Sequence, residues 1–84
     1  MTYEIDYAAG ERAGCSSKLI IADRVTIYVK LFSSEPTRFF SGDPKGAIQK
    51  EITKAELDVW LNILADNEAE VLEVQKKLTL GKRY

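Results

Sequence analysis

The side chains that most often perform acid–base or nucleophilic chemistry are scarce in this 84-residue sequence. It contains no histidine, which removes the commonest general base and the Ser-His and Cys-His nucleophile pairs. The single cysteine, Cys15, could act as a nucleophile only if Arg12 or Lys18 lowered the pKa of its thiol. Asp66 and Glu70 are spaced one helical turn apart, but without a recognisable cleft they indicate solubilising charge. We therefore expect no enzymatic activity, no cofactor and no metal site.

The glycines and serines between positions 10 and 17 invite comparison with a phosphate-binding loop. Such loops end in Gly-Lys-Ser/Thr, with four residues between the two glycines. Here only three residues separate Gly10 from Gly14, and Gly14 is followed by Cys15 and Ser16. The sequence therefore predicts an ordinary loop over residues 8–17.

Aromatic and basic residues interleave along one side of a predicted strand over residues 24–32. Arg24, Tyr28, Lys30 and Phe32, joined by Arg38, would form a face of the kind that stacks and holds single-stranded nucleic acid. The same residue types anchor protein interfaces. The net charge of −1 favours a protein partner over nucleic acid. The sequence is equally compatible with a covered face, over which the long loop or a neighbouring strand lies.

A second candidate surface is acidic. Six carboxylates and no basic residue occur between Glu56 and Glu73. A row of carboxylates on a helix could occupy a basic groove made for nucleic-acid phosphates, which would imitate nucleic acid electrostatically. The residues proposed for this surface are Asp58, Asp66, Glu68, Glu70 and Glu73.

These observations favour a non-catalytic protein-binding module, an inhibitor or accessory factor that acts by occlusion or scaffolding. One alternative is a nucleic-acid-binding protein that uses the aromatic and basic sheet face. Another is an acidic-helix mimic that blocks a nucleic-acid-binding protein. The module could form a homodimer, and an origin in a phage or mobile element is compatible with a chain of this size.

Length and composition predict one domain over residues 1–84, with a sheet region over 1–51, a helix over 52–81 and a tail over 82–84. No segment is apolar enough for a membrane span, so no membrane association is expected. One cysteine is consistent with a reducing compartment. The first four residues also lack the basic and apolar regions of a signal peptide, which favours a cytoplasmic location.

The elements that must position these residues begin with the helix near the carboxyl end. Thr53 and Glu56 have the spacing of a capping box, and Ile52 with Leu57 has the spacing of a hydrophobic staple. No glycine or proline then interrupts the chain until Gly81, which is placed as a left-handed C-cap. We expect one continuous or slightly kinked helix over residues 52–81.

Two features of this helix conflict with a straight rod. A helix over residues 54–80 would be about 40 Å long, whereas a compact chain of this size is about 30 Å across. Glu68 also falls within the apolar arc, where an unpaired carboxylate is costly. Three arrangements would accommodate Glu68: a break at Asp66-Asn67 with Asn67 capping a second helix, a position beyond the edge of the core, or a basic group on a partner.

The apolar arc of the helix is predicted to face the core, and a heptad-like seam along it could also serve a dimer. The arc consists of Leu57, Trp60, Leu61, Leu64, Val71, Leu72 and Leu78. The seam consists of Leu57, Leu61, Leu64, Glu68, Val71, Gln75 and Leu78.

Alternating apolar residues predict strands over residues 2–7, 18–21, 24–32, 38–41 and 47–51, with turns over 33–37 and 41–46. Val25, Ile27, Val29 and Leu31 share one side of the longest strand and are expected to pack on the helix. The predicted fold is therefore α+β: an antiparallel meander of three to five strands with the long helix packed on one face.

Overall fold

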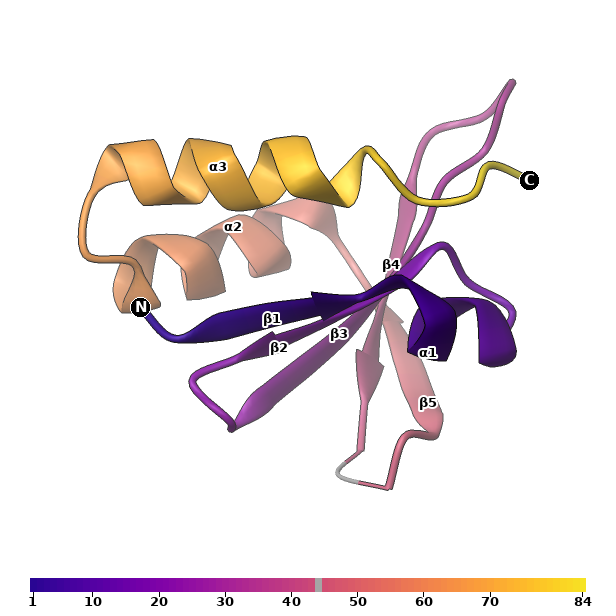
Figure 1. The fold of residues 1–84 in the computed structure, drawn as a ribbon, viewed down its shortest axis with the longest axis horizontal. Helices are drawn as coiled ribbons and strands as arrows, with labels where there is room; N and C mark the ends of the chain where they lie inside the picture. Colours follow the sequence, from indigo (N-terminus) through magenta and orange to yellow (C-terminus); the bar gives the residue numbers. More distant parts are fainter. Residues whose placement is uncertain (44) are drawn as a thin grey trace.

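The computed structural model describes residues 1–43 and 45–84. Five strands form one antiparallel sheet in which each strand pairs with the next along the chain. Two helices follow the last strand and lie side by side over one face of the sheet (Figure 1). This arrangement confirms the predicted α+β class and the antiparallel meander. The elements are β1 (Tyr3–Asp6), α1 (Tyr7–Arg12), β2 (Ser17–Ile21), β3 (Val25–Lys30), β4 (Arg38–Gly42), β5 (Ile48–Ile52), α2 (Lys54–Leu64) and α3 (Glu68–Leu78).

The pairing of the strands defines two faces of the sheet. Leu19 pairs with Ile27, and Val29 pairs with Phe39, so these side chains share the face that packs on the helices, which we call the inner face. The side of β3 that was predicted to pack on the helix does face the core. Ile27 and Val29 are fully buried, and Val25 packs against the same core. Lys18, Tyr28 and Phe40 are paired on the opposite side, the outer face.

A short helix replaces the loop that was expected over residues 8–17. Asp6 ends β1 and caps α1, because its carboxylate accepts a hydrogen bond of 2.9 Å from the backbone N–H of Ala9. Gly10 lets α1 lie directly against β2, since a Cβ atom at this position would be 2.3 Å from the Cα atom of Ser17. The prediction failed because this helix depends on close packing with a neighbouring strand more than on its own sequence.

The prediction of a single long helix was also wrong, because the helix is interrupted between Leu64 and Glu68, which gives α2 and α3. Asn67 caps the second helix by accepting a hydrogen bond of 2.9 Å from the backbone N–H of Glu70. The molecule measures 31 × 29 × 21 Å, and each eleven-residue helix is about 16 Å long, so both fit over the sheet. The alternative with a break at Asp66-Asn67 is therefore the arrangement observed.

The helix break changes which apolar residues reach the core. Leu57, Leu61 and Val71 are buried within one chain, so the seam considered for a dimer is already occupied by the sheet and the facing helix. Trp60 and Leu72, which were expected in the core, remain 41% and 60% exposed. Two short antiparallel helices each turn a narrower stripe toward the sheet than the broad arc drawn for one helix.

The two ends of the predicted helix had different outcomes. The capping box is confirmed: Thr53 accepts from the N–H of Glu56, and Glu56 accepts from the N–H of Thr53. Gly81 is not the C-cap, because α3 ends at Leu78 and Thr79 takes the cap position. Gly81 instead allows close approach to the sheet, since a Cβ atom there would be 2.8 Å from the carbonyl oxygen of Ser16.

The connection between β4 and β5 was predicted as a turn, and Asp43 organises the described part of it. Its carboxylate accepts hydrogen bonds from the backbone N–H groups of Lys45 and Ala47, at 2.9 and 2.8 Å. Gly46 has a positive φ of 90°, which favours glycine. Pro44 of the predicted turn lies outside the described residues. Within the described residues, no helix combines the length and apolar character needed to cross a membrane.

Candidate functional site

The side of α2 turned away from the core carries large apolar residues. At 100° per residue, Val59 and Ile63 lie opposite Leu57 and Leu61, and Trp60 lies on the flank between the two sides. Val59 is 56% exposed, Trp60 41% and Ile63 67%. We call these three residues the outward stripe. A surface helix normally carries polar residues at such positions, so the outward stripe is a candidate contact surface.

A groove of about 470 Å³ lies between the facing ends of α2 and α3 and the β3–β4 connection. Its floor is apolar, with contributions from Leu31, Phe39 and Leu57. At the rim, Asp58 accepts hydrogen bonds of 3.0 Å from both Lys54 and Gln75. The polar groups at the rim are therefore occupied by one another.

The structure places the predicted sheet-face residues in different environments. Tyr28 is 2% exposed, and its hydroxyl donates a hydrogen bond of 2.6 Å to the carbonyl oxygen of Gly46. Tyr28 therefore offers no ring to the solvent. Arg24 is exposed in the β2–β3 turn, where its N–H donates to the carbonyl oxygen of Ile21.

Lys30 and Arg38 are paired across β3 and β4, so the structure does bring these two cations together. Arg38 forms a two-pronged ion pair with Glu51, at 2.7 and 2.8 Å. This hydrogen-bonded pair raises the pKa of Arg38 and lowers the pKa of Glu51. The Arg38 guanidinium also lies 5.4 Å from the ring centre of Phe40.

Lys30 and Phe32 belong to a cluster that includes the end of the chain. The ammonium group of Lys30 lies 5.6 Å from the ring centre of Phe32 and 4.8 Å from that of Tyr84. Lys82 lies 5.1 Å from the Tyr84 ring, whose hydroxyl donates to the carbonyl oxygen of Cys15 at 2.9 Å. The ammonium group of Lys30 thus lies near two rings, one of which, Phe32, was predicted with it to bind a partner.

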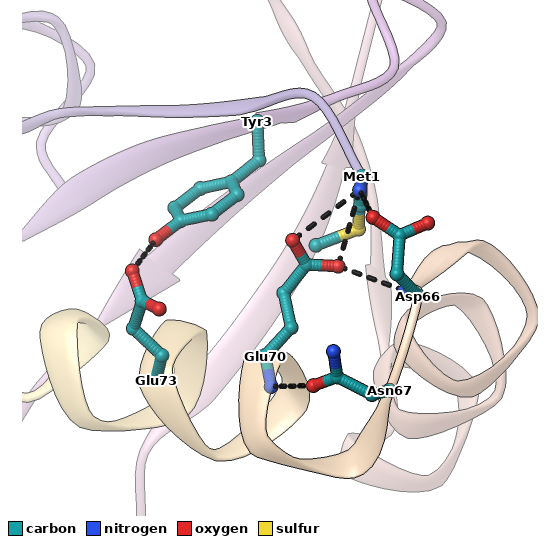
Figure 2. A network of polar contacts seen from close by, with 6 residues as sticks. All are labelled: Met1, Tyr3, Asp66, Asn67, Glu70 and Glu73. Carbon is teal, nitrogen blue, oxygen red and sulfur yellow. Dashed lines mark hydrogen bonds and ion pairs between the residues drawn. The ribbon is translucent and has the colours of Figure 1, made fainter.

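The acidic helix residues are mostly engaged within the molecule (Figure 2). The amino group of Met1 contacts the carboxylates of Asp66 and Glu70, and the hydrogen bond that it donates to Asp66 is the main cause of its raised pKa. Glu73 accepts hydrogen bonds from the hydroxyl of Tyr3 at 2.5 Å and from Lys77 at 2.9 Å. These two hydrogen bonds lower the pKa of Glu73. The pKa of Lys77 is raised, first by the hydrogen bond of 2.9 Å that it donates to the hydroxyl of Tyr3 and then by the one to Glu73.

The two remaining predicted acids, Asp58 and Glu68, lie in different environments. Asp58 is held by Lys54 and Gln75 at the groove rim. Glu68 is exposed in the first turn of α3, and it makes no ion pair or side-chain hydrogen bond with the described residues. Most of the negative charge predicted for a nucleic-acid mimic is therefore balanced by nearby donors.

Cys15 has a buried environment. It is 2% exposed, and burial raises the pKa of its thiol more than nearby Lys30 lowers it. The thiol rather than the thiolate is favoured at neutral pH. Among the described residues, no three His, Cys, Asp or Glu side chains are grouped to hold a metal ion.

Sequence reasoning missed the outward stripe, although its signal was present. Val59 and Ile63 are four residues apart, and the helical period places them on the side assigned to the acidic back. The role of Tyr84 had no local signal, since residue 84 meets Lys30 only because the tail pairs with Leu31 and Ser33, just after β3.

The chain was compared with known protein families, curated proteins and solved structures, and nothing in them matches it. Its function therefore has to be argued from its own surfaces. Of these, the outward stripe presents three large apolar side chains to solvent on one helix.

Proposed function

We propose that this chain is a non-catalytic protein-binding domain, an inhibitor or accessory factor that inserts the outward side of α2 into a groove on another protein. The observation that carries the proposal is the exposure of Val59, Trp60 and Ile63 on one helix, at 56%, 41% and 67%. A helix laid in a groove is a recurring mode of recognition, with anchors about one turn apart. A cytoplasmic setting suits Cys15, because the sequence contains no second cysteine to pair with it.

These three side chains still expose apolar surface that a partner could bury. Fully burying a large apolar side chain contributes about 1.5–3 kcal/mol, so burying the exposed half contributes on the order of 1 kcal/mol for each. Tryptophan is also enriched among the residues that dominate binding energy in protein interfaces. We therefore assign the central anchor to Trp60, with Val59 and Ile63 beside it.

Charge indicates the chemistry of the partner. Glu56 lies near the start of α2 and Glu68 follows its end, so acids that form no ion pair with the described residues lie at both ends of the outward stripe. An apolar groove bordered by lysine or arginine side chains would complement this arrangement. A second copy of this chain would not, because antiparallel pairing of two α2 helices would bring Glu56 of each toward Glu68 of the other.

The other predicted surfaces support this choice by contrast. Lys30 and Arg38 of the sheet face are paired with rings or with Glu51. Glu73 of the acidic row is paired with Lys77. A partner that used either surface would first have to displace these internal contacts, whereas the outward stripe needs no such step.

The test uses a photo-reactive amino acid at position 63, with position 34 in the exposed β3–β4 connection as the control. We expect crosslinking to a host protein from position 63 and not from position 34. The captured protein is then purified and titrated into the unmodified chain. Because Trp60 is the only tryptophan in the sequence, a blue shift of its emission reports burial of the outward stripe.

The control variants separate binding from folding. Ile63→Asp should weaken binding at least about thirtyfold, which corresponds to a hot-spot loss of about 2 kcal/mol, while the circular dichroism spectrum stays unchanged. Equal crosslinking from both positions, or unchanged affinity of Ile63→Asp, would contradict the proposal. A crosslinked dimer of this chain would replace the proposed partner with a second copy.

A further inference from the structure

We propose that the outer face of the sheet holds a binding site for a phosphate group, in a hollow of about 270 Å³ between α1 and the β4–β5 turn. Three cations line it: Arg12, Lys18 and Lys45. We call it the cationic hollow. Its size lies below the usual range for drug-sized ligands, about 300–1,000 Å³, and suits a small anion. The inference is independent of α2, which lies on the other side of the sheet.

Three segments that are distant in the sequence converge on the cationic hollow. Arg12 is the last residue of α1, Lys18 lies on β2, and Lys45 follows β4. Lys18 is paired with Tyr28, and its ammonium group lies 5.9 Å from the centre of the Tyr28 ring. Tyr28 forms a fixed wall of the hollow, because it is 2% exposed and its hydroxyl donates a hydrogen bond to the carbonyl oxygen of Gly46.

Gly46 helps to keep the hollow open. A Cβ atom at this position would lie 3.5 Å from the hydroxyl of Tyr28 and 3.9 Å from the ammonium group of Lys18. A longer side chain would therefore enter the space between them. The φ angle of 90° makes any such residue strained as well.

The positive charge of the hollow has no carboxylate to balance it. Among the described residues, no acidic side chain lines the hollow, and none of the ion pairs involves Arg12, Lys18 or Lys45. The neighbouring acids do not line the hollow: Glu11 precedes Arg12 in the sequence and is exposed, and Asp6 is paired with Lys18 across β1 and β2. The carboxylate of Asp6 accepts from the N–H of Ala9, and that of Asp43 accepts from the N–H of Lys45. Cations held around one space repel each other, and a bound anion would remove that repulsion.

The residue types favour phosphate among anions. The planar guanidinium of Arg12 can donate two parallel hydrogen bonds to phosphate oxygens, and lysines add flexible point charges. This site is not a phosphate-binding loop. The N–H groups of Ala13, Gly14 and Cys15 donate to carbonyl oxygens within α1, so the side chains alone would hold the anion.

The test titrates inorganic phosphate into ¹⁵N-labelled protein at constant ionic strength, with chloride as the reference anion. We expect saturable shifts of the Lys18 and Gly46 amide signals at millimolar phosphate, and none with chloride. Arg12→Gln and Lys45→Gln should each weaken this binding about tenfold, by loss of a charge-assisted contact. Lys50→Gln, at an exposed residue on β5, should change it less than about twofold.

A second arm identifies the source of the phosphate group. A single-stranded oligonucleotide is titrated in the same way. If it shifts the same signals at a lower concentration than inorganic phosphate does, and if Arg12→Gln weakens its binding as well, the phosphate belongs to a nucleic-acid backbone. If inorganic phosphate binds at least as tightly, it belongs to a small phosphate ester. Shifts that do not saturate, or that are equal in Arg12→Gln and in the unmodified protein, would overturn the proposal. Arg12 and Lys45 are both exposed, so both variants should fold, and thermal melts are the measurement that checks this.

Discussion

The two sides of α2 are built from similar residues and have different environments. Leu57 and Leu61 are 2% and 0% exposed, whereas Val59 and Ile63, two positions further along in each case, are mostly accessible. Apolar character alone therefore does not decide which side of this helix packs. The sheet and α3 supply apolar surface for only one side, and the other side remains exposed.

The difference in burial between the two sides depends on how α2 is held at both ends. The capping box at Thr53 starts the helix directly after β5, so its first turn is fixed relative to the sheet. At the other end, Ala65 adopts an extended conformation and Asn67 starts α3 in the opposite direction. Together these ends determine that Leu61, and not Ile63, meets the core.

Truncating one residue on each side of α2 should give the largest difference. Leu61→Ala should lower the free energy of unfolding by about 2–5 kcal/mol, because it leaves a cavity in the core. Ile63→Ala should change it by less than about 0.5 kcal/mol, as for most surface substitutions. Urea unfolding followed by circular dichroism measures both. Equal losses would mean that the outward stripe is packed in the isolated protein.

A smaller effect is expected at the helix break that separates the two sides. Asn67→Ala removes the acceptor for the N–H of Glu70 and should cost about 1 kcal/mol of unfolding free energy. Asn67→Gly is the matched control, and it should cost only a few tenths of a kcal/mol because glycine is tolerated at this position. A stabilised Asn67→Ala variant would indicate that α2 and α3 can join into one helix.

The smallest effect concerns acid, which acts on the contacts between α3 and β1. Folding lowers the pKa of Glu73 below 4.5, mainly through the hydrogen bond from Tyr3, so the ionised carboxylate favours the folded state. This stability is fully present above the unfolded pKa and is lost as the pH falls through 4.5 and below. Glu73→Gln should therefore show a smaller loss of thermal stability than the unmodified chain between neutral and acidic pH.

The control for the acid prediction is Glu68→Gln, since Glu68 makes no ion pair or side-chain hydrogen bond with the described residues. Its melting temperature should follow that of the unmodified chain at each pH. If Glu73→Gln behaves in the same way, the Tyr3–Glu73 contact does not contribute to holding α3 over the sheet.

Local signals were predicted well wherever neighbouring residues complete them. The capping box of Thr53 and Glu56 spans four residues, and the alternation of Ile27 with Tyr28 spans two. Both could be found without knowledge of the rest of the chain. The contrast with Gly81 is informative: its sequence position suits a C-cap, but its role is to fit against Ser16, which is 65 positions away.

The candidate site was predicted less well than the fold, for a related reason. Lys30 and Arg38 were assigned correctly to one face, since strand alternation and pairing place them there. That Tyr28 would be covered on that face could not be derived, because α1 and the β4–β5 turn approach it from distant parts of the chain. The exposure of a side chain depends on all the residues that surround it in the fold, whereas the sequence directly identifies only its neighbours along the chain.

The sequence by itself determined the order of the strands, the start of α2 and the apolar side of β3, because short-range hydrogen bonding and side-chain periodicity control these features. Only the tertiary structure decided that the carboxyl-terminal helix breaks at Asn67, that the outward stripe stays exposed, and that three cations share one hollow. The physical reason is that a helix of about 40 Å cannot lie within a molecule 31 Å long. Once the chain folds back, packing leaves one side of α2 without a partner.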